Sequence, residues 1–144
     1  MKITLESVVL PETEVIIRGD VTSEEVVSLL QSLKKCNSRK IILFKDEEQY
    51  LVDVSEIVFF EVYNNKTYAY LMQDVYDAKH KLYELKELLD SHLFVQINKS
   101  VIVNMNYIKS IQAEFSGNYR VKLKNRKESL TISRKYFKDF KEQI

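Results

Sequence analysis

The sequence contains very little cysteine, glycine and proline, and each shortage excludes a kind of protein. A single cysteine in 144 residues rules out a disulfide framework, and two glycines with one proline leave no flexible or proline-rich linker. The longest strictly apolar runs, IILF and IVFF, are only four residues long. Because a spanning helix needs roughly 20 apolar residues, the sequence predicts no membrane insertion and a cytoplasmic protein.

Catalytic signatures are also missing. The sequence contains no GxSxG, P-loop, glycine-rich dinucleotide turn or HExxH pattern, and no Cys/His/carboxylate cluster at metal-ligand spacing. His80 and His92 flank a predicted helix and are expected to be surface residues rather than ligands. We therefore expect neither an enzyme nor a protein with a metal or cofactor.

Charge is distributed unevenly along the chain, although the net charge is only +1. Lys and Arg number six against six Asp and Glu in residues 1–40, five against eleven in 41–96, and eleven against four in 97–144. A basic last third is typical of a polyanion-binding face. From charge alone, a solubilising surface whose acids lie nearby in space is the simpler explanation.

Residues 1–38 are predicted to form a small β-β-α extension. Segments 2–10 and 14–18 are rich in Val and Ile and are separated by Pro11, which favours two strands around a turn. Thr22 and Glu25 have capping-box spacing and apolar residues follow at helical intervals, so a helix is predicted to begin at Thr22. The extension lacks the length and the acidic pocket of a phosphoacceptor receiver domain.

From residue 41 to residue 144 the pattern predicts a second, mostly β domain with short helices. Two strands are expected within 94–104, joined by polar residues 98–100. The other predicted strands are 41–44, 50–54, 57–63, 67–72, 108–115, 119–123 and 129–132. Leucines at helical spacing between 82 and 89 predict a helix that packs on the sheets. Asn104 is expected to hold a turn or a cap, and Ser133 to cap the last helix.

Three exposed polar connections carry side chains suited to reading DNA: the tip 64–67, the connection 98–100, and Arg134 with Lys135. Arg and Lys can address guanine O6 and N7, Asn can pair with adenine, and hydroxyls can bind phosphate. Arg134 and Lys135 begin a predicted helix, where cations oppose the helix dipole. Free amides beside two such cations are typical of a site for an anion outside the fold. Taken alone, the pattern is equally compatible with two solvated cations that cost little free energy.

These motifs, in this order, closely resemble the LytTR-type DNA-binding domain of bacterial transcription regulators. The resemblance covers residues 41–144 and is carried by FVQINKS, VIVN, IKSI, SGN and SRKY. It implies an elongated set of small, mostly antiparallel β-sheets with one or two short helices, whose loops enter DNA grooves. Many such proteins place a receiver domain before the DNA-binding part. This chain resembles instead the stand-alone members with a small N-terminal extension.

The resemblance also implies which residues contact DNA. Base contacts in the family come from the loop matching residues 65–68, from the position matching Lys99, and from the arginine matching Arg134. Many members carry a histidine where this chain has Asn98. Ser100 and Lys135 are expected to hold the phosphate backbone. The predicted DNA-binding residues are Asn65, Lys66, Thr67, Tyr68, Asn98, Lys99, Ser100, Arg134 and Lys135.

Double-stranded DNA is the predicted partner. The nine tyrosines and seven phenylalanines would also suit stacking on single strands, but they lie mainly in the acidic middle third. For residues 1–38, homodimerisation is favoured over a membrane-protein or other regulatory partner and over simple packing, and adjacent DNA sites would also bring two copies together. The alternative function is a protein-interaction or ligand-sensing module, in which Arg134 and Lys135 meet an acidic partner.

Overall fold

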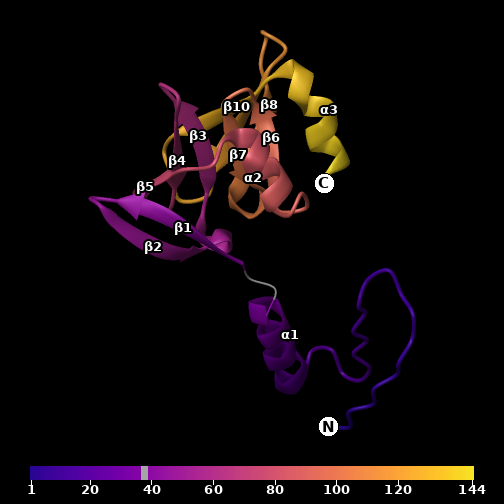
Figure 1. Ribbon diagram of the computed structural model, residues 1–144. Coiled ribbons are helices and arrows are strands. Elements are labelled where there is room, and N and C mark those ends of the chain that lie inside the picture. The colour runs from indigo at the N-terminus through magenta and orange to yellow at the C-terminus, as the bar shows by residue number, and fades with distance from the viewer. Residues whose placement is uncertain (37–38) are drawn as a thin grey trace. The chain divides into compact units, whose positions relative to one another are not determined.

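The computed structural model describes residues 1–36 and 39–144, and the chain divides into two compact units, Met1–Asn37 and Ser38–Ile144 (Figure 1). Every strand of the described residues belongs to the second unit and runs antiparallel to its neighbours. This confirms the expectation of a mostly β fold with short helices. Within the same residues, no helix is long and apolar enough to cross a membrane.

The helix of the first unit is α1 (Glu24–Cys36). The Ser23 hydroxyl accepts a hydrogen bond from the Val26 amide at 3.3 Å, so Ser23 caps the helix. Thr22 instead closes a turn, because its amide and hydroxyl both donate to the Asp20 carboxylate, at 3.0 and 2.6 Å. The hydrogen bonds from the Thr22 hydroxyl and amide lower the pKa of Asp20. The predicted capping residue was therefore wrong by one position.

The two strands predicted at 2–10 and 14–18 are not formed. Both segments lie outside regular structure, and apolar side chains such as Ile3, Leu5 and Ile16 are exposed. A two-stranded hairpin is marginal in water unless a third strand or a helix covers its apolar face. Val and Ile alternation reflects a preference for a half-buried pleated surface, and residues 1–36 contain no other strand that could form one.

The larger sheet of the second unit has seven strands. They are β1 (Lys40–Lys45), β2 (Glu48–Asp53), β3 (Phe59–Tyr63), β4 (Lys66–Tyr70), β5 (Val75–Ala78), β6 (Phe94–Asn98) and β7 (Val101–Asn104). Their order across the sheet is β2-β1-β5-β4-β3-β7-β6. The sequence did not predict β5, because its four residues show no alternation of apolar and polar side chains. This agrees with the structure, in which only Ala78 of the strand is buried.

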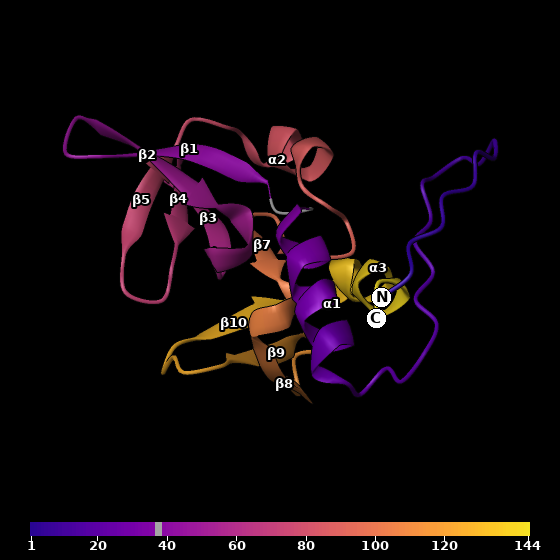
Figure 2. The same ribbon diagram turned by 90° about the horizontal axis from the view of Figure 1, so that it is seen from below.

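A second sheet of three strands is hydrogen-bonded separately from the larger sheet and packs against it (Figure 2). It consists of β8 (Ile108–Ala113), β9 (Tyr119–Leu123) and β10 (Ser129–Ile132), in the order β10-β9-β8. Strands β9 and β10 bury alternate residues in one core with Phe59 of β3 and with Val58, which directly precedes β3. Helix α3 (Arg134–Glu142) completes this core by burying Phe140. Ile132, two residues before α3, is buried in the same core, so the core holds the chain both at the entry to α3 and near the end of the helix.

A separate hydrophobic core lies under α2 (Leu82–Leu88). Leu85 is fully buried among residues of the larger sheet, including Leu43, Phe60 and Ile102. This confirms that the leucine pattern marks a helix that packs on the sheet. The helix is only seven residues long, and its first turn is held by a hydrogen bond from the Lys81 amide to the Glu84 carboxylate at 3.1 Å.

Asn104 is fully buried, and its polar side chain joins two segments of backbone. Its Oδ1 accepts from the Asn106 amide at 3.0 Å, and its Nδ2 donates to the Ile57 carbonyl at 2.9 Å and the Ser55 carbonyl at 3.3 Å. The side chain thus caps the short 3-10 turn η2 (Met105–Tyr107) and holds the segment before β3. The prediction that Asn104 holds a turn or a cap is confirmed.

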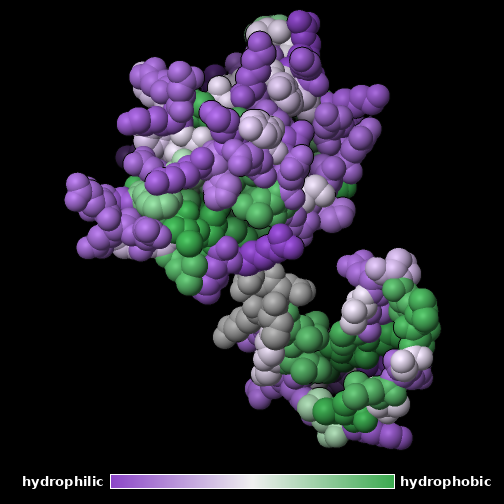
Figure 3. Space-filling model, in the orientation of Figure 1, coloured by the Kyte–Doolittle hydropathy of each residue, from purple (hydrophilic) through white to green (hydrophobic). Residues whose placement is uncertain are grey.

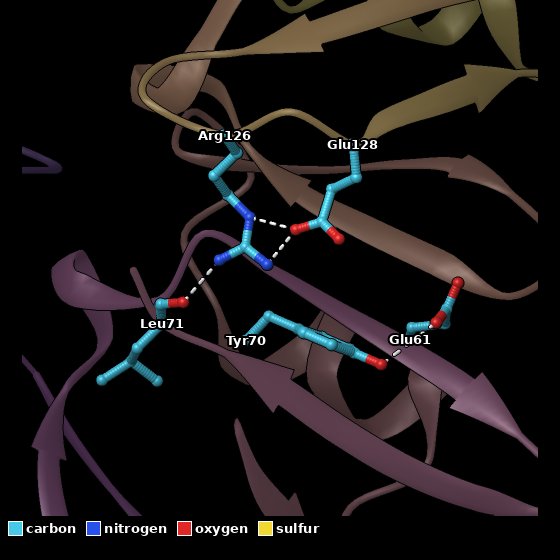
Figure 4. A network of polar contacts seen from close by, with 5 residues as sticks. All are labelled: Glu61, Tyr70, Leu71, Arg126 and Glu128. Carbon is cyan, nitrogen blue, oxygen red and sulfur yellow. Dashed lines mark hydrogen bonds and ion pairs between the residues drawn. The ribbon is translucent and has the colours of Figure 1, made fainter. Parts of the chain in front are cut away.

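Arg126, in the turn between β9 and β10, ties the two sheets together (Figure 4). Its Nη1 donates to the Leu71 carbonyl at 2.7 Å, and its guanidinium pairs with the Glu128 carboxylate. The guanidinium carbon lies 5.6 Å from the centre of the Phe59 ring and 6.0 Å from that of Tyr70. Only 13% of the Arg126 side chain is exposed, so solvent screens these contacts weakly.

Arg126→Ala is expected to lower the free energy of unfolding by about 1–3 kcal/mol, because the Leu71 carbonyl loses its donor and Glu128 its cation. Urea denaturation of the full chain measures the change. Arg120→Ala is a matched control, since this more exposed arginine meets Glu114 only at 3.7 Å and should change stability by less than about 0.5 kcal/mol. Equal effects of the two substitutions would contradict the structural role of Arg126.

Candidate nucleic-acid interface

The first predicted site is the tip of the β3–β4 hairpin. Asn64 and Asn65 have φ angles of +50° and +62°, the left-handed values that a two-residue hairpin turn requires and that asparagine tolerates. Tyr63 pairs with Lys66 across this turn, and the Lys66 side chain is exposed at the start of β4. The turn therefore presents a cation from a rigid hairpin rather than from a long loop.

The second site is the turn between β6 and β7, where Lys99 is exposed. Asn98 builds this turn, because its Oδ1 accepts from the Ser100 amide and its Nδ2 donates to the Thr131 carbonyl, both at 2.8 Å. The Ser100 carbonyl in turn accepts from the Val62 amide at 2.8 Å. Since both polar groups of Asn98 are engaged inside the protein, Asn98 holds the turn and Lys99 is the side chain presented to solvent.

The third site is the start of α3, where Arg134 and Lys135 are exposed. The Arg134 amide donates to Oδ1 of Asn118 at 3.2 Å, so a residue of the β8–β9 loop supplies the capping oxygen. Ser133 was predicted to do this, but its side chain makes no capping hydrogen bond. Its amide instead donates to the Ile97 carbonyl at 2.9 Å, which turns the chain from β10 into α3 beside β6.

Gly117 allows the Arg134 side chain to lie across the β8–β9 loop. A Cβ atom at this position would stand 2.9 Å from Arg134 Cδ, and the φ angle of +89° is one that other residues rarely adopt. The sequence shows a turn at 116–118 but gives no sign that it supports Arg134. Asn118 and Gly117 were missed because the contact joins residues more than fifteen positions apart.

A groove of about 600 Å³ joins the first two sites. Lys66 and Lys99 both line it, and the buried Thr67 lies against it, whereas Tyr68 is half-buried and does not line it. Two further lysines of the groove, Lys79 and Lys81, were not predicted as site residues. They lie in the connection from β5 to α2, in a part of the sequence with an excess of acids, so no basic cluster marks them.

The three sites form one continuous surface. The groove joins the first to the second, and the hydrogen bonds from Asn98 to Thr131 and from Ser133 to Ile97 join the second to the third. Figure 1 shows the β3–β4 tip and the start of α3 at the same upper end of the second unit, and Figure 3 shows mostly hydrophilic residues over that end.

Cations on this surface are available to an external partner. Among the described residues, Lys66, Lys99 and Arg134 take part in no ion pair within the protein. Rigid turns that carry unpaired cations can bind phosphates and, where a guanidinium is well oriented, the acceptor edge of guanine. Fold and surface together define a polyanion-binding protein built on a β-scaffold.

Comparison with known proteins gives the family. The sequence profile of the LytTr DNA-binding domain matches residues 47–144, and the chain therefore belongs to this family of DNA-binding domains. It is 31% identical over 121 residues, 84% of this chain and 80% of the relative, to an uncharacterised HTH-type transcriptional regulator from Staphylococcus aureus strain NCTC 8325 / PS 47. A relative with the same description from strain MRSA252 matches at the same identity and coverage.

A solved structure shows the same fold. The LytTr DNA-binding domain of a putative methyl-accepting/DNA response regulator from Bacillus cereus superimposes with a TM-score of 0.68 at 25% sequence identity. The match covers 72% of this chain and 94% of that chain. The predicted resemblance and the predicted fold class are both confirmed.

Proposed function

We propose that the chain is a cytoplasmic transcriptional regulator that binds double-stranded DNA in a sequence-specific manner. The observation that carries this proposal is the continuous surface formed by the β3–β4 tip, the β6–β7 turn and the start of α3. Membership of a family of DNA-binding domains supports DNA as the polyanion that this surface binds. The relatives named as transcriptional regulators support a role of DNA binding in the control of transcription. The protein binds DNA without a cofactor in this proposal.

Different residues of the surface would do different work. Arg134 is suited to a guanine, because its backbone is held by the Asn118 cap and its side chain, including Nε and Nη1, lies over Gly117 without an ion-pair partner in the described residues. Lys66 and Lys99 would read or anchor at the two turns, with Lys79 and Lys81 following the phosphates along the groove. Lys135 and Ser100 would hold the backbone, while Asn98 positions Lys99.

We propose a second copy of the chain as the partner of residues 1–37. Apolar side chains are exposed along this unit, including Leu5, Val9 and Val15, and Figure 3 shows hydrophobic residues gathered on its surface. Regulators commonly double their DNA contacts by symmetry, so two copies bound side by side would select a repeated motif.

Selection from random duplex DNA by the purified full chain tests the proposed function. The affinities of the protein for the selected duplex and for a scrambled duplex are then measured at one stated salt concentration, because phosphate contacts make affinity strongly dependent on salt. We expect an enriched motif that binds at least about a thousandfold more tightly than the scramble. Equally weak binding to both duplexes would contradict the proposal and favour an acidic protein as the partner of the cationic surface.

Lys135→Ala is expected to weaken binding to all sequences alike. Loss of one phosphate contact should make the plot of the logarithm of the binding constant against the logarithm of salt concentration less steep by about one unit. The preferred motif should not change. Lys141→Ala is the matched control, since this lysine lies at the far end of α3 with its Nζ 5.7 Å from the centre of the Phe137 ring. A salt slope unchanged by Lys135→Ala would show that Lys135 does not contact the backbone.

A further inference from the structure

Phe115 is the most exposed large hydrophobic residue of the described part of the chain, with a solvent-accessible area that is 113% of the reference value for phenylalanine. It lies in the loop between β8 and β9, which is tightly closed. The Glu114 amide donates to the Asn118 carbonyl at 2.9 Å, and the Gly117 amide donates to the Glu114 carbonyl at 3.1 Å. A well-bonded loop therefore presents a phenyl ring that makes no packing contact within the protein.

Folding does not explain this position. Burying a phenylalanine usually contributes about 1.5–3 kcal/mol, and Phe115 forgoes that contribution, unlike the neighbouring Tyr119, whose ring stacks on Phe137 with centres 3.6 Å apart. An exposed aromatic residue on a rigid loop is typical of a contact with a partner, because little side-chain freedom is lost when it is covered.

The loop that carries Phe115 is also the loop that supports Arg134. Asn118 caps the Arg134 amide at 3.2 Å, and Gly117 lies directly beneath the Arg134 stem. Phe115 is two residues before Gly117 in this closed loop, so a ligand of Arg134 would lie close to the loop that carries the phenyl ring. The one acidic residue of the loop, Glu114, lies 3.7 Å from Arg120, and this ion pair reduces the repulsion that Glu114 would exert on an approaching phosphate.

We infer that Phe115 contacts DNA beside the base that Arg134 binds, and that the ring packs against the C5-methyl group of a thymine. This inference rests on the proposed function. The C5-methyl group of thymine is an apolar group exposed in the major groove, and a phenyl ring is able to contact it. The cations Arg134 and Lys135 next to the loop favour DNA over an apolar protein surface as the group that covers Phe115.

The test uses the full chain and the operator selected by the wild-type protein, with each thymine replaced in turn by deoxyuridine, which lacks only the methyl group. We expect wild-type binding to weaken about fourfold at one thymine. Phe115→Ala should bind the unmodified operator about fivefold to twentyfold more weakly and should be insensitive to deoxyuridine at that same position. Leu51→Ala is the control, because Leu51 is 66% exposed on β2, at the opposite edge of the seven-stranded sheet from β6.

Several outcomes would overturn the inference. Binding of Phe115→Ala within twofold of the wild type would exclude a DNA contact by Phe115. A deoxyuridine effect that persists in Phe115→Ala, or that appears at no thymine in the wild type, would exclude the methyl contact. If the wild-type chain selects no operator, the proposed function fails and the inference fails with it. An operator that both proteins bind equally well overturns the inference alone.

Discussion

Arg134→Ala is expected to lower affinity for the selected operator by about 1–3 kcal/mol while leaving affinity for scrambled duplex nearly unchanged. A guanidinium that donates to both O6 and N7 of one guanine loses two hydrogen bonds on truncation, and the base is left without its partner. The structure favours such a contact, because the helix start is capped by Asn118 and the arginine stem rests on Gly117. Fluorescence anisotropy on both duplexes at the same salt concentration measures the difference.

Two further variants separate base recognition from simple charge. Arg134→Lys keeps the charge but lacks the planar fork, so it should bind scrambled duplex like the wild type and still lose most of the preference for the operator. Lys135→Ala, one residue further along α3, should weaken both duplexes to the same degree. Equal losses on operator and scramble for Arg134→Ala would refute the role of Arg134 as a base reader.

Asn104→Ala is expected to lower the free energy of unfolding by about 2–4 kcal/mol. The substitution leaves the Asn106 amide and the Ile57 carbonyl without their partners next to a fully buried position, and each such unpaired group costs about 1–3 kcal/mol. It also opens a small cavity beneath the turn that leads from β7 to β8. Urea denaturation should show a lower midpoint with an unchanged slope.

The matched control for Asn104 is Asn106→Ala, because Asn106 is an exposed residue of the same type two positions further on. We expect it to change stability by less than about 0.5 kcal/mol. Asn104→Asp retains the oxygen that accepts from Asn106 but sets a buried carboxylate against the Ser55 and Ile57 carbonyls, so at neutral pH it should destabilise the protein at least as much as Asn104→Ala. Wild-type stability in Asn104→Ala would show that water replaces the side chain at no cost.

The strands of the second unit could be predicted from the sequence where one face is buried. Val121, Leu123 and Leu130 alternate with polar residues and lie in the core as that alternation requires. The same kind of pattern in residues 2–10 failed, because alternation shows only that a segment would suit a sheet, and no strand of the described residues pairs with it. β5 was not predicted for the opposite reason. Its sequence lacks the alternation of a strand, but pairing with β1 and β4 holds it in the sheet.

Candidate cations could also be predicted, because an isolated Lys or Arg at a polar turn has no reason to be buried. Lys66, Lys99 and Arg134 are all exposed at turns or at a helix start. The support of these cations could not be predicted. The cap that Asn118 provides for Arg134 and the bond from Asn98 to Thr131 join residues that are distant in sequence.

The sequence by itself determined the family, the antiparallel β character and the residue types available for binding DNA, because local periodicity and turn chemistry depend on neighbouring residues. Only the tertiary structure decided which side chains act together. It brought Lys79 and Lys81 into the groove that Lys66 and Lys99 also line, and it joined the two sheets through Arg126. It also left Phe115 exposed to solvent in the loop that contacts Arg134. These relations depend on the pairing of distant segments, and the free energy of that pairing comes from cores that no local pattern describes.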